Sequence, residues 1–203
     1  MATNAMDTCF RIAVLGAKNV GKTSLITRLM KKDFREKYNP TIEALFRYDI
    51  PTSETSYTKL EILDTAGDFE FPDMLRTAIR NSNAFTLVFD LSDPMRTFRE
   101  VETLRQWILE EGRDEVPIIV IGNKADLNSE QDTTDNKIID AIVSIDWGCP
   151  YITTSAKDDV NISDMYDAVC KGLNIKTEPK PVINGGCKKE TSKKFKFRRL
   201  SLF

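Results

Sequence analysis

One short segment of the chain combines the glycines, the lysine and the hydroxyl group that phosphate binding requires. Residues 16–23 have the sequence GAKNVGKT, which matches the pattern GxxxxGK[ST]. In this pattern the glycines let backbone N–H groups turn toward phosphate oxygens, and the helix that follows adds the partial positive charge of its N-terminus. We expect Lys22 to bridge the β- and γ-phosphates and the Thr23 hydroxyl to hold Mg²⁺. The segment therefore predicts a site for a nucleotide.

A second motif, NKAD at residues 123–126, indicates which base is bound. It follows a continuous apolar run, and the carboxyl ends of buried parallel strands form the ligand crevice of such domains. The carboxylate of Asp126 can accept two hydrogen bonds from N1–H and the 2-amino group of guanine, whereas adenine offers no such pair. Asn123 can meet the opposite base edge, and the stem of Lys124 can cover the ring. The motif favours guanine, and the alternative of an ATP-dependent kinase would require adenine preference.

Strand-like and helix-like segments alternate between the motifs. Short apolar runs predict strands at 10–15, 44–50, 60–63, 84–91, 116–123 and 150–155. Apolar residues at helical spacing predict helices after Lys22, after Pro94, around 138–143 and over 162–173. This alternation predicts a three-layer α/β domain with a mostly parallel sheet. Residues 154–157, TSAK, would follow its last strand and fit a second base-contacting loop.

The composition excludes several kinds of chemistry. The chain has 203 residues, 29 Lys and Arg against 31 Asp and Glu, four Cys and no His. Without His there is no Ser-His-Asp or Cys-His pair and no His-ligated metal, so we expect any metal to be a hard cation on oxygen ligands. The cysteines show no CxxC pair, and the first ten residues have no signal-peptide pattern, so we expect reduced thiols in an intracellular protein. No apolar run is long enough to span a membrane.

Taken together, the motifs resemble those of the Ras-type small GTPases over about residues 10–174. The resemblance implies a P-loop GTPase fold, with a six-stranded mostly parallel sheet, one antiparallel edge strand and five flanking helices. It implies GTP/GDP and Mg²⁺ as cofactors, and hydrolysis by attack of water on the γ-phosphate. It also implies a switch that presents residues 38–46 and 67–76 to effector proteins. We expect a monomer that binds no nucleic acid.

The resemblance also assigns roles to single residues. Thr41 is expected to complete the Mg²⁺ coordination, Asp64 to hold a Mg²⁺-bound water, and the Gly67 N–H to contact the γ-phosphate. Phe34 occupies the position of an aromatic that packs edgewise against guanine, with packing in the core as the alternative. The expected catalytic residues are Lys22, Thr41, Gly67 and Asp68, and the expected metal site comprises Thr23, Thr41 and Asp64. The expected nucleotide-binding residues are Gly16, Lys18, Asn19, Val20, Gly21, Lys22, Thr23, Ser24, Phe34, Thr41, Gly67, Asn123, Lys124, Asp126, Ser155, Ala156 and Lys157.

The chain departs from the family pattern at the residue that follows Gly67. Asp68 stands where Ras-type enzymes usually carry the Gln that orients the attacking water. An ionised carboxylate only accepts hydrogen bonds, and it adds negative charge beside the γ-phosphate. We therefore predict slow GTP hydrolysis. The alternative is a nucleotide-loaded interaction module without catalysis, controlled by its level or location.

Two further departures lie in the phosphate-binding segment, where Lys18 and Asn19 replace two glycines that are common in the family. Lys18 is long enough to block the arginine finger of an activating protein or to reach the γ-phosphate itself. The alternative is that its side chain points to solvent.

Two other segments can be compared with particular parts of the family pattern. Residues 71–74, FPDM, resemble the corresponding segment of the Di-Ras and Rhes/dexras branches, which also lack the Gln. Residues 41–43, TIE, fit the Ras effector segment, but Ala44 and Leu45 replace its usual acidic and small polar pair. We expect weaker binding by effectors that depend on the acidic residue.

Composition divides the chain into an N-terminal extension (1–9), a Ras-like domain (10–175), a linker (176–187) and a tail (188–203). The tail holds seven Lys or Arg and one Glu, a net charge of +6. Because the whole chain carries −2, residues 1–187 carry −8. The near-neutral total therefore conceals two oppositely charged parts.

The tail alternates basic residues with apolar ones, which favours binding to anionic membrane. Its apolar residues are Phe195, Phe197, Leu200 and Phe203, among others. We expect a cytoplasmic protein that is peripheral at the inner face of the plasma membrane; a solvated tail or a nuclear signal is the alternative. Cys187 lies too far from the end for prenylation but is a candidate for palmitoylation. Residues 201–203, SLF, suit a PDZ domain, and Ser201 after two arginines suits a basophilic kinase.

Overall fold

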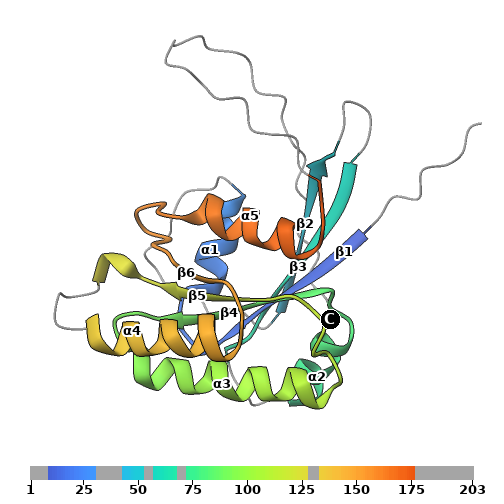
Figure 1. Ribbon diagram of the computed structural model, residues 1–203. Helices are drawn as coiled ribbons and strands as arrows, with labels where there is room; N and C mark the ends of the chain where they lie inside the picture. Colours follow the sequence, from blue (N-terminus) through green and yellow to red (C-terminus); the bar gives the residue numbers. More distant parts are fainter. Residues whose placement is uncertain (1–8, 31–42, 53–56, 68–71, 128–132, 177–203) are drawn as a thin grey trace, which may run out of the picture.

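A six-stranded sheet forms the centre of the molecule, with helices on both of its faces (Figure 1). The computed structural model describes residues 9–30, 43–52, 57–67, 72–127 and 133–176. Its strands are β1 (Cys9–Gly16), β2 (Glu43–Pro51), β3 (Tyr57–Thr65), β4 (Ala84–Asp90), β5 (Ile118–Asn123) and β6 (Tyr151–Thr153). Their order is β2-β3-β1-β4-β5-β6, with β2 antiparallel to β3 and every other pair parallel. This confirms the predicted sheet.

Five α-helices flank the sheet in the described part of the chain. They are α1 (Lys22–Leu29), α2 (Pro72–Arg80), α3 (Pro94–Glu110), α4 (Thr133–Ala141) and α5 (Ile162–Gly172). A 3₁₀ turn, η1 (Ala125–Leu127), follows β5, and a π-helical turn, η3 (Ile142–Asp146), extends α4. The helices α1 and α5 cover one face of the sheet, and α2, α3 and α4 cover the other (Figure 1). None of the helices in these ranges is long and apolar enough to cross a membrane.

The burial of β4 and β5 explains why their sequences are unbroken apolar runs. Every residue of β4 and of β5 is buried, because helices cover both faces of the sheet at this point. On α3 the apolar residues at helical spacing face the same core, with Phe98, Val101, Leu104 and Ile108 buried. The helix begins at Pro94, as predicted, where a proline needs no hydrogen-bond partner for its nitrogen.

Two strands, β3 and β6, differ most in length from the prediction, whereas the others differ by one or two residues. The strand expected at 60–63 begins at Tyr57, because β2 and β3 pair continuously from Glu43–Thr65 to Pro51–Tyr57. The strand expected at 150–155 spans only Tyr151–Thr153, although backbone hydrogen bonds to β5 and the loop after it continue at Pro150 and Thr154. Pairing with β2 extends β3 through polar residues that an apolar pattern does not mark.

The segment of α2 was not predicted as a helix, although its apolar residues Leu75, Ala78 and Ile79 have helical spacing and pack against the core. Contacts with α3 hold α2 in addition. Arg80 Nε donates to Glu111 Oε2 at 2.6 Å, and Arg76 Nη1 donates to Glu111 Oε1 at 2.8 Å. The Arg76 guanidinium also lies 5.0 Å from the ring centroid of Trp107. Hydrogen bonds from Arg80 and Arg76 hold the pKa of Glu111 below its usual value. These contacts attach α2 to the C-terminal end of α3.

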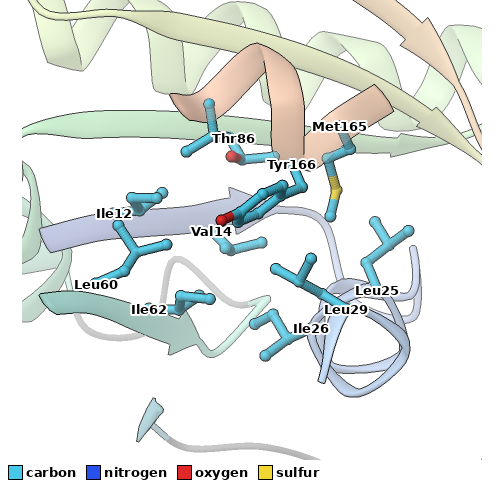
Figure 2. A pocket seen from close by; sticks show the side chains of 11 residues that line it. Ile12, Val14, Leu25, Ile26, Leu29, Leu60, Ile62, Thr86, Met165 and Tyr166 are labelled. Carbon is cyan, nitrogen blue, oxygen red and sulfur yellow. The ribbon is translucent and has the colours of Figure 1, made fainter. Parts of the chain in front are cut away.

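A small apolar cavity lies inside the core between β1, β3, α1 and α5. Its volume is about 20 Å³, close to the minimum that holds one water molecule. Apolar side chains from these elements point into it, and Tyr166 of α5 contributes its ring (Figure 2). Because the lining is almost wholly apolar, it is a packing gap of the core rather than a polar binding site.

Residues 1–8 and 177–203 lie outside the described residues. The boundaries of the predicted extension, linker and tail therefore stay predictions.

Candidate nucleotide-binding site

Three loops meet at one edge of the sheet. The segment 16–23 follows β1, the segment 123–126 follows β5, and the segment 154–157 follows β6. Because β1, β4, β5 and β6 are parallel neighbours, the loops at their carboxyl ends lie on the same side. The structure therefore brings together the three predicted nucleotide-contacting segments.

Two glycines of the phosphate-binding loop are required by what lies against them. Gly16 has φ 146°, and a Cβ there would lie 2.0 Å from the carbonyl oxygen of Val88. Gly21 has φ 96°, and a Cβ there would lie 2.3 Å from Asn123 Nδ2. Asn19 has φ 62°, a left-handed conformation that asparagine tolerates better than most residues. At Asn19 the loop thus has a backbone conformation typical of glycine, the residue that is common at this position in the family.

The side chain of Lys22 lies inside the curve of this loop. Lys22 is only 6% exposed, and its Nζ donates to the carbonyl oxygens of Gly16 and Ala17 at 2.8 Å each. Val20 is buried, and Ser24 lies in the first turn of α1, where its carbonyl accepts from the Thr27 hydroxyl. The ammonium group is therefore placed where the motif requires it, among the backbone groups that would surround a phosphate.

Two of the expected metal-site residues contact each other. Thr23 Oγ1, at the start of α1, donates to Asp64 Oδ2 at 2.7 Å, near the end of β3. Asp64 is completely buried. A hydroxyl and a carboxylate are the hard oxygen donors that Mg²⁺ prefers, and Mg²⁺ keeps several of its waters. The residues present therefore fit this ion, although Thr41 lies outside the described residues.

Gly67 approaches the phosphate-binding loop very closely. A Cβ at Gly67 would lie 2.5 Å from both the Cα and the backbone nitrogen of Lys18, so only glycine fits. Lys18 itself is exposed. The contact places the Gly67 backbone against the loop, as its expected role requires. Asp68 and Phe34 lie outside the described residues, so their expected roles stay predictions.

Asn123 connects all three loops. It is 1% exposed, and its Nδ2 donates to the carbonyl oxygen of Val20 at 2.8 Å. Its Oδ1 accepts from Thr154 Oγ1 and from the Ala156 backbone N–H, both at 3.2 Å. The sequence predicted a contact with the base edge, which stays a prediction; the structure shows the amide joining the loops to one another.

Asp126 lies among the other expected base-contacting residues. Ser155 Oγ donates to Asp126 Oδ1 at 2.7 Å, and Lys157 Nζ lies 3.8 Å from Asp126 Oδ2. Lys124, with φ 66°, forms an ion pair with Asp90. The loops thus gather a carboxylate, a hydroxyl and two ammonium groups around the expected base site.

Sequence reasoning missed Arg28 and Asp90. Arg28, in the last turn of α1, donates from Nε to the carbonyl oxygen of Ala156 at 2.7 Å and from Nη2 to that of Lys157 at 2.6 Å. Asp90 is the last residue of β4. Neither belongs to a motif, and the carbonyl partners of Arg28 lie far away along the chain. Asp90 ends a predicted strand, a position where ligand-binding residues gather, and this was the one signal that could have identified it.

A buried lysine in a glycine loop between a strand and a helix, with a hydroxyl–carboxylate pair beside it, defines a P-loop nucleotide-binding domain. Residues 11–175 match the family model of the Ras family. The Ras-related protein rapC of Dictyostelium discoideum is 34% identical over 171 residues, which cover 82% of this chain and 60% of that relative. The chain belongs to the Ras family of small GTPases. It spans about 60% of the length of the curated relative that it matches.

We expect Arg28→Ala to loosen the loop at 154–157, because it removes the hydrogen bonds to two carbonyl oxygens of that loop. Release of a fluorescent GDP analogue, followed by stopped-flow fluorescence, should become about tenfold faster, since a hydrogen bond to a charged group contributes roughly 1.5–3 kcal/mol. Arg99→Ala, an exposed arginine on α3, is the matched control and should release at the wild-type rate. Wild-type release from Arg28→Ala would show that the arginine has no such role.

Proposed function

We propose that this protein is a guanine-nucleotide switch that binds GTP/GDP with Mg²⁺ and hydrolyses GTP slowly. The observation that carries this proposal is the junction at Asn123, which joins the phosphate-binding loop to both base-contacting loops. In the switch, GTP and Mg²⁺ order residues 38–46 and 67–76, which then contact effector proteins. The protein acts as a monomer and binds no nucleic acid.

Each described residue has one task in this proposal. Lys22 binds the β- and γ-phosphates, and the N–H of Gly67 donates to the γ-phosphate. Thr23 and Thr41 would bind the metal ion, and Asp64 would hold one of its waters. Bound Mg²⁺ would offset the negative charge of the phosphates. Asp126 accepts from the guanine edge, and Ser155 fixes the orientation of its carboxylate.

Protein purified without added nucleotide should therefore carry GDP or GTP. Nucleotide released by denaturation and separated by anion-exchange chromatography should contain guanine and no stoichiometric adenine. Asp126→Asn replaces one of the two acceptor oxygens by an amide donor, so it should lose bound guanine nucleotide. A preparation that carries only ADP or ATP would contradict the proposal.

Slow hydrolysis rests on Asp68, whose carboxylate cannot donate a hydrogen bond to the γ-phosphate. The alternative function is a nucleotide-loaded module that signals without hydrolysis. The two functions differ in one measurable quantity, the single-turnover rate of GTP cleavage.

We expect the wild-type protein to hydrolyse bound GTP more slowly than the roughly 4 × 10⁻⁴ s⁻¹ of an ordinary Ras protein. Asp68→Gln should raise the rate about tenfold or more, because it restores a group that both donates to an oxygen and accepts from the water. Single-turnover release of phosphate measures both rates. Asp114→Asn, an exposed carboxylate far from the site, is the control.

A wild-type rate equal to that of ordinary Ras proteins would refute slow hydrolysis. No cleavage by either wild type or Asp68→Gln would favour the module without catalysis.

The proposed effector surface differs from that of ordinary Ras proteins at Ala44 and Leu45. Both are buried, and Leu45 packs with Leu63 and Ala78. These positions therefore supply no polar side chain to an effector, which supports weaker binding by effectors that need an acidic residue there. Separately, residues 71–74 and the absence of Gln at position 68 support a place near the Di-Ras and Rhes/dexras branches.

We further propose that the tail carries the protein to the inner face of the plasma membrane, with palmitoylation of Cys187 as a second anchor. What supports this is the charge of +6 on residues 188–203. A nuclear signal is the alternative. The PDZ-like end at residues 201–203 is a separate contact, which phosphorylation of Ser201 would weaken.

Truncation after Asn184 should abolish sedimentation with vesicles of phosphatidylserine and phosphatidylcholine, because each basic residue near an anionic surface contributes about 1 kcal/mol. Binding of the full chain should fall with added salt and be absent with phosphatidylcholine alone. Removal of only Ser201–Phe203 should spare most vesicle binding while eliminating any PDZ contact. Equal sedimentation of the full and truncated chains would refute the role of the tail.

A further inference from the structure

The carboxylate of Asp90 lies beside the loop that is expected to contact the base. Asp90 ends β4 and pairs in register with Asn123, the last residue of β5. Its Oδ2 lies 2.6 Å from Nζ of Lys124, and the Asp90 side chain is only 10% exposed. The attraction between two charges that are partly shielded from water is screened less than it would be on the open surface.

Further hydrogen bonds fix this carboxylate in place. Its Oδ1 accepts from the backbone N–H of Ser92 at 2.9 Å and from Ser92 Oγ at 2.7 Å. The backbone N–H of Asp90 donates to Thr97 Oγ1 at 3.0 Å, which holds the residue to the first turn of α3. Asp90 therefore presents Oδ2 to Lys124 from a rigid support, and the lysine must adapt to it.

Lys124 has a backbone conformation that most side chains avoid, with φ 66°. Its side chain is 23% exposed. The ion pair draws the ammonium group toward β4, which leaves the methylene stem between the backbone and Asp90. Lys157 offers a contrast: it lies 3.8 Å from Asp126 and is 53% exposed, so its own charge pair is looser.

We propose that Asp90 is a positioning residue for nucleotide binding that acts through Lys124. By neutralising and anchoring the ammonium group, it holds the lysine stem ready to cover the purine ring, so that less side-chain freedom is lost when the nucleotide binds. Asp90 itself contacts no part of the nucleotide. The inference rests on the proposed guanine-nucleotide binding and adds a residue outside the recognised motifs.

Asp90→Asn tests this with little change in size. The amide oxygen can still accept from Ser92, but the charge is lost and an amide donor is placed beside the ammonium group. Release of a fluorescent GDP analogue should become about tenfold faster, since the lost interaction is a hydrogen bond between charged groups. Asp93→Asn, a neighbouring carboxylate that pairs with exposed Arg96, is the matched control and should release at the wild-type rate.

A double-mutant cycle with Lys124→Met separates positioning from a general structural effect. Methionine keeps an apolar stem but has no charge for Asp90 to hold. In that background Asp90→Asn should change the release rate by less than about twofold. A second readout is the ratio of GDP to IDP release rates, because IDP lacks the 2-amino group that Asp126 is expected to contact. The ratio should stay at its wild-type value in Asp90→Asn, since the lysine stem covers either base equally.

Release of GDP at the wild-type rate from Asp90→Asn would overturn the inference. So would a roughly tenfold effect of Asp90→Asn that persists in the Lys124→Met background, or a change in the ratio of the GDP to the IDP release rate. If Asp90→Asn does not fold, Lys124→Met alone decides: it should release GDP about tenfold faster with the ratio unchanged, and wild-type release would overturn the inference. If the wild-type protein retains no guanine nucleotide, the proposed function itself is wrong. If it retains guanine nucleotide but Asp90→Asn releases it at the wild-type rate, only the inference about Asp90 is wrong.

Discussion

The hydrogen bonds of one buried amide, that of Asn123, hold the whole site together. One side of the amide donates to Val20 in the phosphate-binding loop, and the other accepts from Thr154 and Ala156 in the loop after β6. Buried polar groups are costly to leave unpaired, so the three loops cannot move apart independently. The same amide leaves no room for a Cβ at Gly21. The positions expected for the phosphates and for the base are therefore coupled through this side chain.

The two substitutions in the phosphate-binding loop have different physical consequences. Asn19 keeps the left-handed backbone that a glycine would adopt, so the loop retains its path. Lys18 lies with its backbone against Gly67, where the next residue along is Asp68. Lys18 therefore changes the charge and the space near residues 67–76, and it does not change the path of the phosphate-binding loop. A departure from a family pattern thus has to be judged by the contact it alters.

The sequence was informative wherever structure depends on neighbouring residues. Unbroken apolar runs identified β4 and β5, and Pro94 marked the start of α3, because burial on both faces and helix initiation leave local patterns. It failed where a distant partner decides the outcome. Arg28 finds its carbonyl partners in the loop after β6, and Asp90 finds Lys124 after the neighbouring strand. Such partners are chosen by the approach of elements in space, which spacing along the chain does not encode. The helix α2 is different, because its apolar residues do have helical spacing and the pattern was overlooked.

The base side of the site is built so that a nucleotide adds interactions without breaking those already present. An ionised carboxylate has about four acceptor positions. Ser155 uses one of those on Asp126, and Lys157 lies too far away for a short hydrogen bond, so two guanine donors can still be accommodated. On the phosphate side, Lys22 donates to two backbone carbonyls, which hold its ammonium group against the phosphate-binding loop. Recognition of the base thus costs little rearrangement, and the lysine that would bind the phosphates is already held beside their expected position.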